Sequence, residues 1–332
     1  MLSIVVPVYN EQELVAVMAE RALRLDERLN EPLELLFVDD GSTDRTLERI
    51  QQLREADARI KYISFSRNFG HQTAVSAGLK HAVGDVVAVI DGDLQDPPEA
   101  IPDFVEKLRT GFDVVYAVRR QRKESALKRT CYWGFYRLLS SLSATRIPLD
   151  SGDFCVMNRR VVDTLNDLPE RNRFVRGLRA WVGFNQVGLE YSRDARLAGE
   201  VKYTWRKLLR LAFDGMVSFS HRPLQLIGSA GLLIALFAFV GLALFFVCSV
   251  FDIPILGHSP REAPGYTTLT LSVLFLGGVQ LVSLGIIGEY IGRIFDEVKQ
   301  RPLYIVRSSG GLDREPTTQP FVAPQVLAAV GH

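Results

Sequence analysis

Residues Val87 to Glu99 read VAVIDGDLQDPPE and are the most informative segment of the chain. Its apolar, β-branched start is typical of a buried strand. Gly92 allows a tight turn, so the carboxylates of Asp91 and Asp93 are expected to leave the strand end close together. Two carboxylates and the carboxamide of Gln95 at alternate positions suit a hard divalent cation. The stretch therefore predicts a metal site at the end of a strand, although an acidic surface loop would have the same local sequence.

The surrounding sequence alternates between strand and helix patterns. β-Branched runs predict strands, and apolar residues spaced three and four apart predict helices. Strands are expected at residues 2–8, 33–38, 60–65, 86–90 and 114–118, and helices at 11–29, 44–53, 72–82 and 101–108. This order is typical of an α/β fold, a mostly parallel sheet with helices on both faces. Asp39-Asp40 and Asp91 each follow a strand, so they are expected at the same edge of the sheet.

Composition and missing motifs exclude several classes of protein. The net charge of +1 over 332 residues argues against a nucleic-acid binder. The sequence has neither a G-x-G-x-x-G after the first strand nor a P-loop motif, which disfavours dinucleotide and P-loop chemistry. The three cysteines form no C-x-x-C pair, which disfavours a zinc cluster or a disulfide framework.

Two segments combine basic and aromatic residues. Residues 119–146 hold eight Lys or Arg and one Glu, interleaved with Tyr, Trp, Phe and Leu, and residues 201–222 repeat the pattern. Such amphipathic segments suit an anionic membrane surface. For residues 119–146, a solvated basic face over a core helix is an equal alternative. For residues 201–222, the apolar sequence that follows favours the membrane.

Two long uncharged stretches predict membrane spans at residues 224–251 and 266–288. As helices, their 28 and 23 residues are long enough to cross a bilayer. The loop between them, residues 252–265, holds one Lys or Arg, whereas the flanking twenty-residue segments hold four each. The positive-inside rule then places both termini in the cytoplasm and the loop outside an inner membrane. We expect residues 289–308 to be a cytoplasmic segment and 309–332 a disordered tail.

At this point the chain resembles a known family. Val5–Glu11, Val38–Asp44, Arg67–Gln72 and Asp91–Glu99 are similar to the motifs of family 2 glycosyltransferases, and in particular of the polyprenyl-phosphate glycosyltransferases. The later stretches Ser151–Phe154, Ala198–Tyr203 and Gly288–Arg293 resemble the bacterial members with two spans, such as the bactoprenol glucosyltransferases. The resemblance extends to about residue 306.

The resemblance implies a GT-A domain over residues 1–200 and a metal-dependent, inverting transfer from a nucleotide-sugar donor to undecaprenyl phosphate. By residue-by-residue transfer, the nucleoside site would comprise Pro7, Tyr9, Glu11, Asp40 and Asp91. Mg²⁺ or Mn²⁺ would be held by Asp93 and Gln95, and Asp91, Asp93 and Asp153 would be the catalytic carboxylates. The phosphates would meet Arg119, Arg129, Arg137, Arg196 and Lys202, with Arg129 and Arg137 as alternatives for one contact with the acceptor.

Several questions stay open in the sequence. Glucose from UDP-glucose is the preferred sugar, with aminoarabinose, mannose and N-acetylhexosamines as alternatives. The resemblance also implies a homo-oligomer such as a tetramer.

Two other classes of protein are alternatives. A processive polysaccharide synthase is disfavoured because the chain lacks a Gln-x-x-Arg-Trp motif. A non-catalytic scaffold that binds a sugar nucleotide is a further alternative, which the intact acidic set disfavours. His71 is interpreted as a structural loop residue, since a single histidine rarely acts alone.

Overall fold

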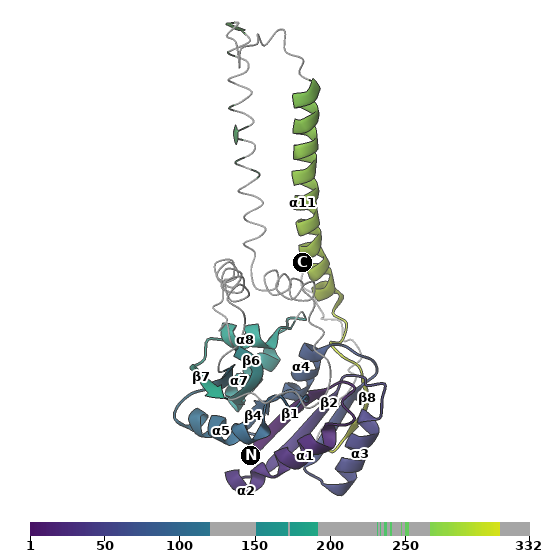
Figure 1. Cartoon of the computed structure of the whole chain (residues 1–332), viewed down its shortest axis with the longest axis vertical. Helices are drawn as coiled ribbons and strands as arrows, with labels where there is room; N and C mark the ends of the chain where they lie inside the picture. Colours follow the sequence, from purple (N-terminus) through teal and green to yellow (C-terminus); the bar gives the residue numbers. More distant parts are fainter. Residues whose placement is uncertain are drawn as a thin grey trace, which may run out of the picture. The chain divides into compact units, whose positions relative to one another are not determined.

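The computed structural model describes residues 1–119, 151–171, 173–191 and 266–312, together with single positions between 231 and 251. The chain divides into two compact units, which are described separately (Figure 1). The first contains residues 1–132, 145–203 and 301–332, and the second contains residues 133–144 and 204–300.

The first unit is built on one sheet, in which the described residues form eight strands. In chain order they are β1 (Leu2–Val8), β2 (Leu33–Asp39), β3 (Ile60–Phe65), β4 (Val86–Val89), β5 (Val114–Arg119), β6 (Ser151–Asn158), β7 (Gln186–Tyr191) and β8 (Val306–Gly310). Their order across the sheet is β7-β5-β6-β4-β1-β2-β3-β8. The five strands expected from the sequence are all present.

The sheet is mixed. β1 pairs in parallel with β2 and β4, β2 with β3, and β5 with β7. β6 runs antiparallel between β4 and β5, and β8 runs antiparallel to β3 at one edge. The parallel βα alternation is therefore confirmed for the first half of the unit. The insertion of β6 was not expected, because strand patterns carry no information about which strands become neighbours.

Helices cover both faces of the sheet. One face carries α1 (Val15–Leu23), α2 (Leu25–Leu29), α3 (Thr46–Ala56), the short helix η1 (Pro98–Ala100) and α5 (Ile101–Arg109), and the other carries α4 (His71–His81), α7 (Arg159–Asp167) and α8 (Val175–Trp181). All seven residues of β1 and of β2 are buried, as expected for strands covered on both sides. Gly78 of α4 lies so close to β1 that a Cβ there would overlap the side chain of Val5.

The last strand comes from the C-terminal part of the chain. β8 lies beside β3 at the edge of the sheet (Figure 1), and the backbone N–H of Ser66 donates to the carbonyl of Ile305 at 2.9 Å. The expected disordered tail was placed from residue 309 onward, but Ser309 and Gly310 belong to β8. The Gly, Pro and Thr content of the tail suggested disorder, whereas pairing along β3 supplies the hydrogen bonds that order its first residues.

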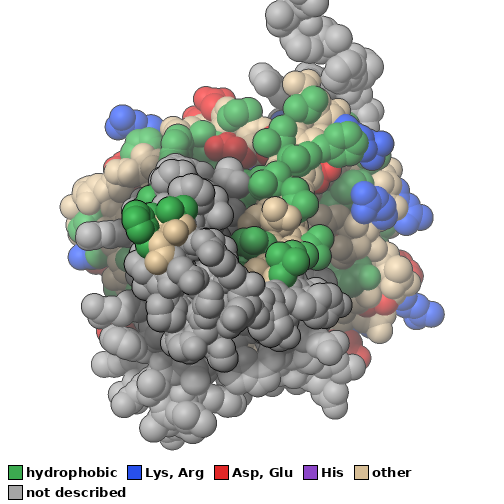
Figure 2. Space-filling view, turned by 90° about the horizontal axis from the view of Figure 1, so that it is seen from above, with side chains coloured by type: hydrophobic (Ala, Val, Ile, Leu, Met, Phe, Trp, Pro, Cys, Tyr) green, Lys and Arg blue, Asp and Glu red, His purple; other side chains and the backbone are tan. Residues whose placement is uncertain are grey.

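The described part of the second unit is dominated by α11 (Tyr266–Lys299). Among the described residues, α11 holds the one segment, Phe275–Lys299, that is long and apolar enough to cross a membrane, by length and composition. Large apolar side chains of α11 are exposed, including Leu281 and Val298. Figure 2 shows exposed hydrophobic side chains on one face of the molecule. The helix continues eleven residues past the end expected for the second span. Of the expected first span at residues 224–251, only eight of the 28 positions are described.

Candidate active site

Carboxylates gather where the parallel strands end. β1 pairs in parallel with both β2 and β4. Asp39, Asp40 and Asp91 therefore lie at one edge of the sheet, the edge formed by the carboxyl ends of these strands. This arrangement is the one expected from the sequence. Open α/β sheets bind ligands at this edge, because the loops that leave the strands diverge there.

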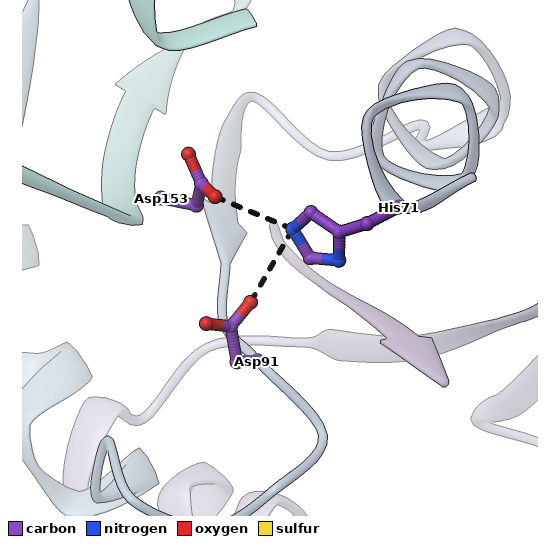
Figure 3. A group of neighbouring side chains, drawn as sticks. All are labelled: His71, Asp91 and Asp153. Carbon is purple, nitrogen blue, oxygen red and sulfur yellow. Dashed lines mark ion pairs between the residues drawn. The ribbon is translucent and has the colours of Figure 1, made fainter. Parts of the chain in front are cut away.

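Three side chains from separate elements meet at this edge. His71 is the first residue of α4, Asp91 follows β4, and Asp153 lies in β6. The Nε2 atom of His71 is 3.5 Å from a carboxylate oxygen of Asp91 and 3.3 Å from one of Asp153. Figure 3 shows both carboxylates turned toward this ring nitrogen. One ligand atom from each residue lies within 4.8 Å of the others, so the three side chains form a candidate metal site.

The register of the antiparallel pair β4–β6 explains how Asp153 reaches the site. Val89 is paired with Cys155. Asp91 lies two residues after Val89, just past the end of β4, and Asp153 lies two residues before Cys155 in β6. The long-range pairing therefore places the two carboxylates opposite each other.

Asp153 is surrounded by hydrogen-bond donors. Arg176 of α8 donates through Nε at 3.3 Å and through a terminal nitrogen at 3.2 Å to one oxygen, and the amide of Gln72 donates at 3.3 Å to the other. Burial alone would raise the pKa of Asp153, but the hydrogen bond from His71 and the charge of Arg176 outweigh it and hold this pKa well below its usual range. Asp153 is therefore ionised throughout the physiological range.

Asp91 shows the opposite shift. Its burial raises its pKa to about 6, with the charge of His71 opposing and the neighbouring carboxylates adding to the rise. One of its oxygens is buried and has no hydrogen-bond partner. Burial lowers the pKa of His71, but its hydrogen bond to Asp153 and the charge of Asp91 outweigh that effect and raise it. That oxygen of Asp91 faces Nε2 of His71 at 3.5 Å without a hydrogen bond, so it is suited to a cationic ligand.

The loop after Asp91 is held in one shape. A Cβ on Gly92 would lie 2.7 Å from Cγ1 of Val8, so the loop packs directly on β1. The N–H of Gln95 donates to Asp93 at 3.1 Å, and the intervening Leu94 is buried with a φ of 56°. The expected pair Asp93 and Gln95 is thus joined by a tight turn, and its role as a metal-binding pair stays a prediction.

The expected nucleoside residues lie at the neighbouring strand ends. Tyr9, which follows Pro7 at the end of β1, is 45% exposed and free to cover a planar ligand. The N–H of Glu11 donates to the hydroxyl of Thr46 at 2.9 Å, which fixes the turn after β1. Their contacts with a nucleoside stay predictions.

Asp40 has a structural partner that the sequence did not reveal. Its carboxylate accepts hydrogen bonds from the backbone N–H groups of Phe69 at 2.7 Å and Gly70 at 2.9 Å. It therefore holds the loop that delivers His71 to the site. Burial raises the pKa of Asp40, although the same two N–H groups act in the opposite direction. Binding of a nucleoside by Asp40 stays a prediction beside this structural role.

The side chains of the expected phosphate-binding residues lie outside the part of the chain that the structure describes. Arg119 is the last residue of β5, but its side chain lies outside the described residues. Arg129, Arg137, Arg196 and Lys202 also lie outside the described residues. Their contacts with phosphates stay predictions.

The sequence analysis missed three side chains of the site. His71 was interpreted as structural, yet it contacts both Asp91 and Asp153. Gln72 and Arg176 were not singled out, because an amide and one arginine among many carry no motif. The one available signal was the position of His71 and Gln72 within a stretch already used for the family resemblance.

Comparison with known proteins defines the class. The model of the family described as glycosyl transferase family 2 matches residues 3–165, which include nearly all of β1, the strands β2 to β6, and Asp40, Asp91 and Asp153. The match identifies the chain as a glycosyltransferase and disfavours a non-catalytic scaffold as its class.

The relatives extend over nearly the whole chain. The chain is 46% identical to an uncharacterised glycosyltransferase of Bacillus subtilis, YkcC, over 94% of this chain and 95% of that protein. It is 42% identical to a prophage-derived bactoprenol glucosyl transferase of Shigella flexneri, over 93% of this chain and 98% of that protein. Among solved structures, a mannosyltransferase of Pyrobaculum calidifontis in complex with GDP-Man and Mn²⁺ is similar with a TM-score of 0.47 and 17% identity, over 91% of this chain and 88% of that one. The chain belongs to glycosyltransferase family 2.

Proposed function

We propose that this enzyme transfers a sugar, preferably glucose from UDP-glucose, to undecaprenyl phosphate at the cytoplasmic face of the inner membrane. The observation that carries the proposal is the similarity to a bactoprenol glucosyl transferase over 93% of this chain. That similarity continues far beyond the sheet into the segment that contains α11. The acceptor, the sugar and the membrane face come from this comparison and from the sequence patterns together.

The donor would bind at the carboxylate edge of the sheet. Pro7, Tyr9, Glu11 and Asp40 would surround the nucleoside, and Asp91 would lie between the ribose and the diphosphate. A divalent cation fits this edge, because the donor set is rich in oxygen and Asp91 carries a buried oxygen without a hydrogen-bond partner. Asp93 and Gln95 would hold Mg²⁺ or Mn²⁺, with Asp91 and Asp153 nearby. When bound, the cation would neutralise charge on the departing nucleoside diphosphate.

The acceptor needs little activation. The second pKa of a phosphate monoester is about 6, so its oxygen is already ionised near neutral pH. That oxygen attacks the anomeric carbon, the bond from this carbon to the donor diphosphate breaks, and the nucleoside diphosphate leaves with the electron pair. Attack from the opposite side inverts the anomeric centre. No proton has to be removed from the nucleophile, so the residues chiefly position two anions.

Basic side chains would hold these two anions together. Arg119, with Arg129 or Arg137, would meet the acceptor phosphate, and Arg196 and Lys202 would meet the donor phosphates. Asp153, which stays ionised beside Arg176, would orient the sugar or the cation. The basic segments at residues 119–146 and 201–222 would bring the lipid head group from the bilayer to this edge.

A donor panel tests the proposal. The purified enzyme in detergent is given undecaprenyl phosphate and one nucleotide sugar at a time, and release of nucleoside diphosphate is measured. UDP-glucose should be the best donor, and a chelator should stop the reaction until Mg²⁺ or Mn²⁺ is restored. A preference for donors of aminoarabinose, mannose or N-acetylhexosamine would keep the reaction and change the sugar. Transfer to a water-soluble acceptor without any transfer to undecaprenyl phosphate would reject the proposal.

Asp93 supplies the sharper test of the metal site. Asp93→Ala should reduce transfer by at least about 100-fold, since it removes a charged ligand of the cation. Asp163→Ala, an exposed carboxylate of α7, serves as the matched control and should leave the rate unchanged. Near-normal turnover of Asp93→Ala at limiting Mn²⁺ would reject the assignment of Asp93.

A further inference from the structure

Gln72 joins three elements of the site through one side chain. Its amide oxygen accepts a hydrogen bond from the backbone N–H of Val175, the first residue of α8, at 2.8 Å. Its amide nitrogen donates to Asp153 in β6 at 3.3 Å. Gln72 itself lies in the first turn of α4. Both ends of a neutral, half-buried side chain are thus used, and one of them faces a candidate catalytic carboxylate.

The same bridge sets the position of the arginine beside that carboxylate. Arg176 follows Val175 directly, so the hydrogen bond that the N–H of Val175 donates to Gln72 fixes the backbone that carries Arg176. Arg176 then donates twice to one oxygen of Asp153, while Gln72 donates to the other. His71, the neighbour of Gln72, contacts the second oxygen as well. Without Gln72, the carboxylate of Asp153 would be free to rotate toward His71 or toward Arg176.

We propose that Gln72 is a positioning residue for glycosyl transfer, because it orients the Asp153 carboxylate and places Arg176 against it. The inference rests on the proposed function, in which Asp153 acts on the sugar or the cation. A positioned carboxylate matters in the transition state, where small displacements are costly. The donor's nucleoside, by contrast, would bind at β1 and β2, away from this contact. Loss of Gln72 should therefore change kcat and leave the KM for the donor nearly unaltered.

Two substitutions separate the two ends of the amide. Gln72→Leu removes both hydrogen bonds. Gln72→Glu keeps an oxygen acceptor for the N–H of Val175 but replaces the donor to Asp153 with a second negative charge. Each should lower kcat on the order of 10- to 100-fold, as expected for loss of a hydrogen bond to a charged group, with the donor KM within about threefold of wild type. Gln51→Leu is the matched control, since Gln51 of α3 donates its amide to the hydroxyl of Tyr62 at 3.2 Å.

A double-mutant cycle with Asp153→Asn decides between the outcomes. If Gln72 acts through Asp153, the double variant Gln72→Leu/Asp153→Asn should be no slower than Asp153→Asn alone. Additive losses would overturn the inference, and so would a normal kcat in both Gln72 variants. If Asp153→Asn transfers at the wild-type rate, the role of Asp153 in the proposed function is rejected. A slow Gln72→Leu variant beside a normal Asp153→Asn variant would also overturn the inference, because Gln72 would not act through Asp153. Calorimetric titration of UDP-glucose reports whether each variant retains a folded donor site.

Discussion

At the scale of single residues, the pKa values of two neighbouring carboxylates are shifted in opposite directions. Asp153 is held ionised by His71 and Arg176, whereas burial raises the pKa of Asp91 to about 6. The difference follows from their partners, because Asp153 has three donors and one oxygen of Asp91 has no hydrogen-bond partner. A carboxylate that is destabilised in the free protein gains most when a cation or a cationic ligand arrives.

Asp91 should make stability fall as pH rises from about 4 to about 6. Its pKa is higher in the folded protein than in the unfolded chain, so the folded state binds more protons in this window and loses that advantage above it. Asp91→Asn, which cannot ionise, should be more stable than wild type above pH 6, by up to about 3 kcal/mol, and slower in transfer. Melting temperatures between pH 4 and 8, measured with a chelator present, check this.

Asp163→Asn provides the comparison, since Asp163 is exposed and lies on the surface of α7. A stabilisation by Asp91→Asn that is the same at pH 4 and pH 8 would contradict the ionisation of Asp91 as its cause.

Gly41 controls the loop that carries His71. It has a φ of 71°, and a Cβ there would overlap the backbone of Arg67. Gly41→Ala should therefore destabilise the first unit by more than about 2 kcal/mol and displace the loop held by Asp40. Gly111→Ala is the control: Gly111 has a φ of 106° but open space around it, so only about 1 kcal/mol of backbone strain is expected. Chemical denaturation compares the two, and equal losses would show that the overlap has no effect.

At the scale of elements, β8 connects the C-terminal part of the chain to the loop beside the site. Tyr304, two residues before the strand, stacks on Phe65 with ring centroids 4.8 Å apart. Its hydroxyl lies 3.2 Å from Nε2 of His81 at the end of α4. Phe65 also meets Phe69 edge to face, and Phe69 lies in the loop fixed by Asp40. Burial raises the pKa of Tyr304 to about 12 and lowers that of His81 to about 4, so both are neutral near pH 7.

Substitutions of Tyr304 separate stacking from hydrogen bonding. Tyr304→Phe keeps the stack on Phe65 and should cost about 1 kcal/mol. Tyr304→Ala removes the buried ring and should cost about 3 kcal/mol, with faster proteolysis of the segment that follows α11. Limited proteolysis and denaturation in the same detergent measure both. Equal effects of the two variants would show that the ring contributes nothing beyond its hydroxyl.

At the scale of the whole molecule, the chain leaves the sheet unit, forms α11 and then returns to the sheet. Six residues separate the end of α11 at Lys299 from the start of β8 at Val306. The connection between the two units is therefore short, since an extended chain rises by only about 3.3–3.6 Å per residue.

The proposed topology is testable by labelling. In a variant without the three native cysteines, Ser259→Cys in the expected outer loop should react with a membrane-impermeant maleimide in intact cells. Arg307→Cys, at the exposed position of β8, should react only after the membrane is opened. Labelling of both positions in intact cells, or of neither, would contradict two spans with both termini in the cytoplasm.

The α/β class and the acidic edge could be predicted from the sequence, because they depend on local patterns: β-branched runs, helical spacing and carboxylates that directly follow strands. The family was indicated by the resemblance of short motifs such as Asp91–Glu99. β1 to β5 and the shared edge of Asp40 and Asp91 are confirmed by the sheet registers.

The assembly of the candidate site depends on tertiary contacts, which the sequence did not predict. β6 enters antiparallel between β4 and β5, which places Asp153 opposite Asp91, and α8 then brings Arg176 against it. The return of β8 to β3 is another pairing of this kind. These contacts join residues far apart in the chain, and no periodicity within one segment specifies its partner, because strand pairing is chosen by the packing of the whole sheet.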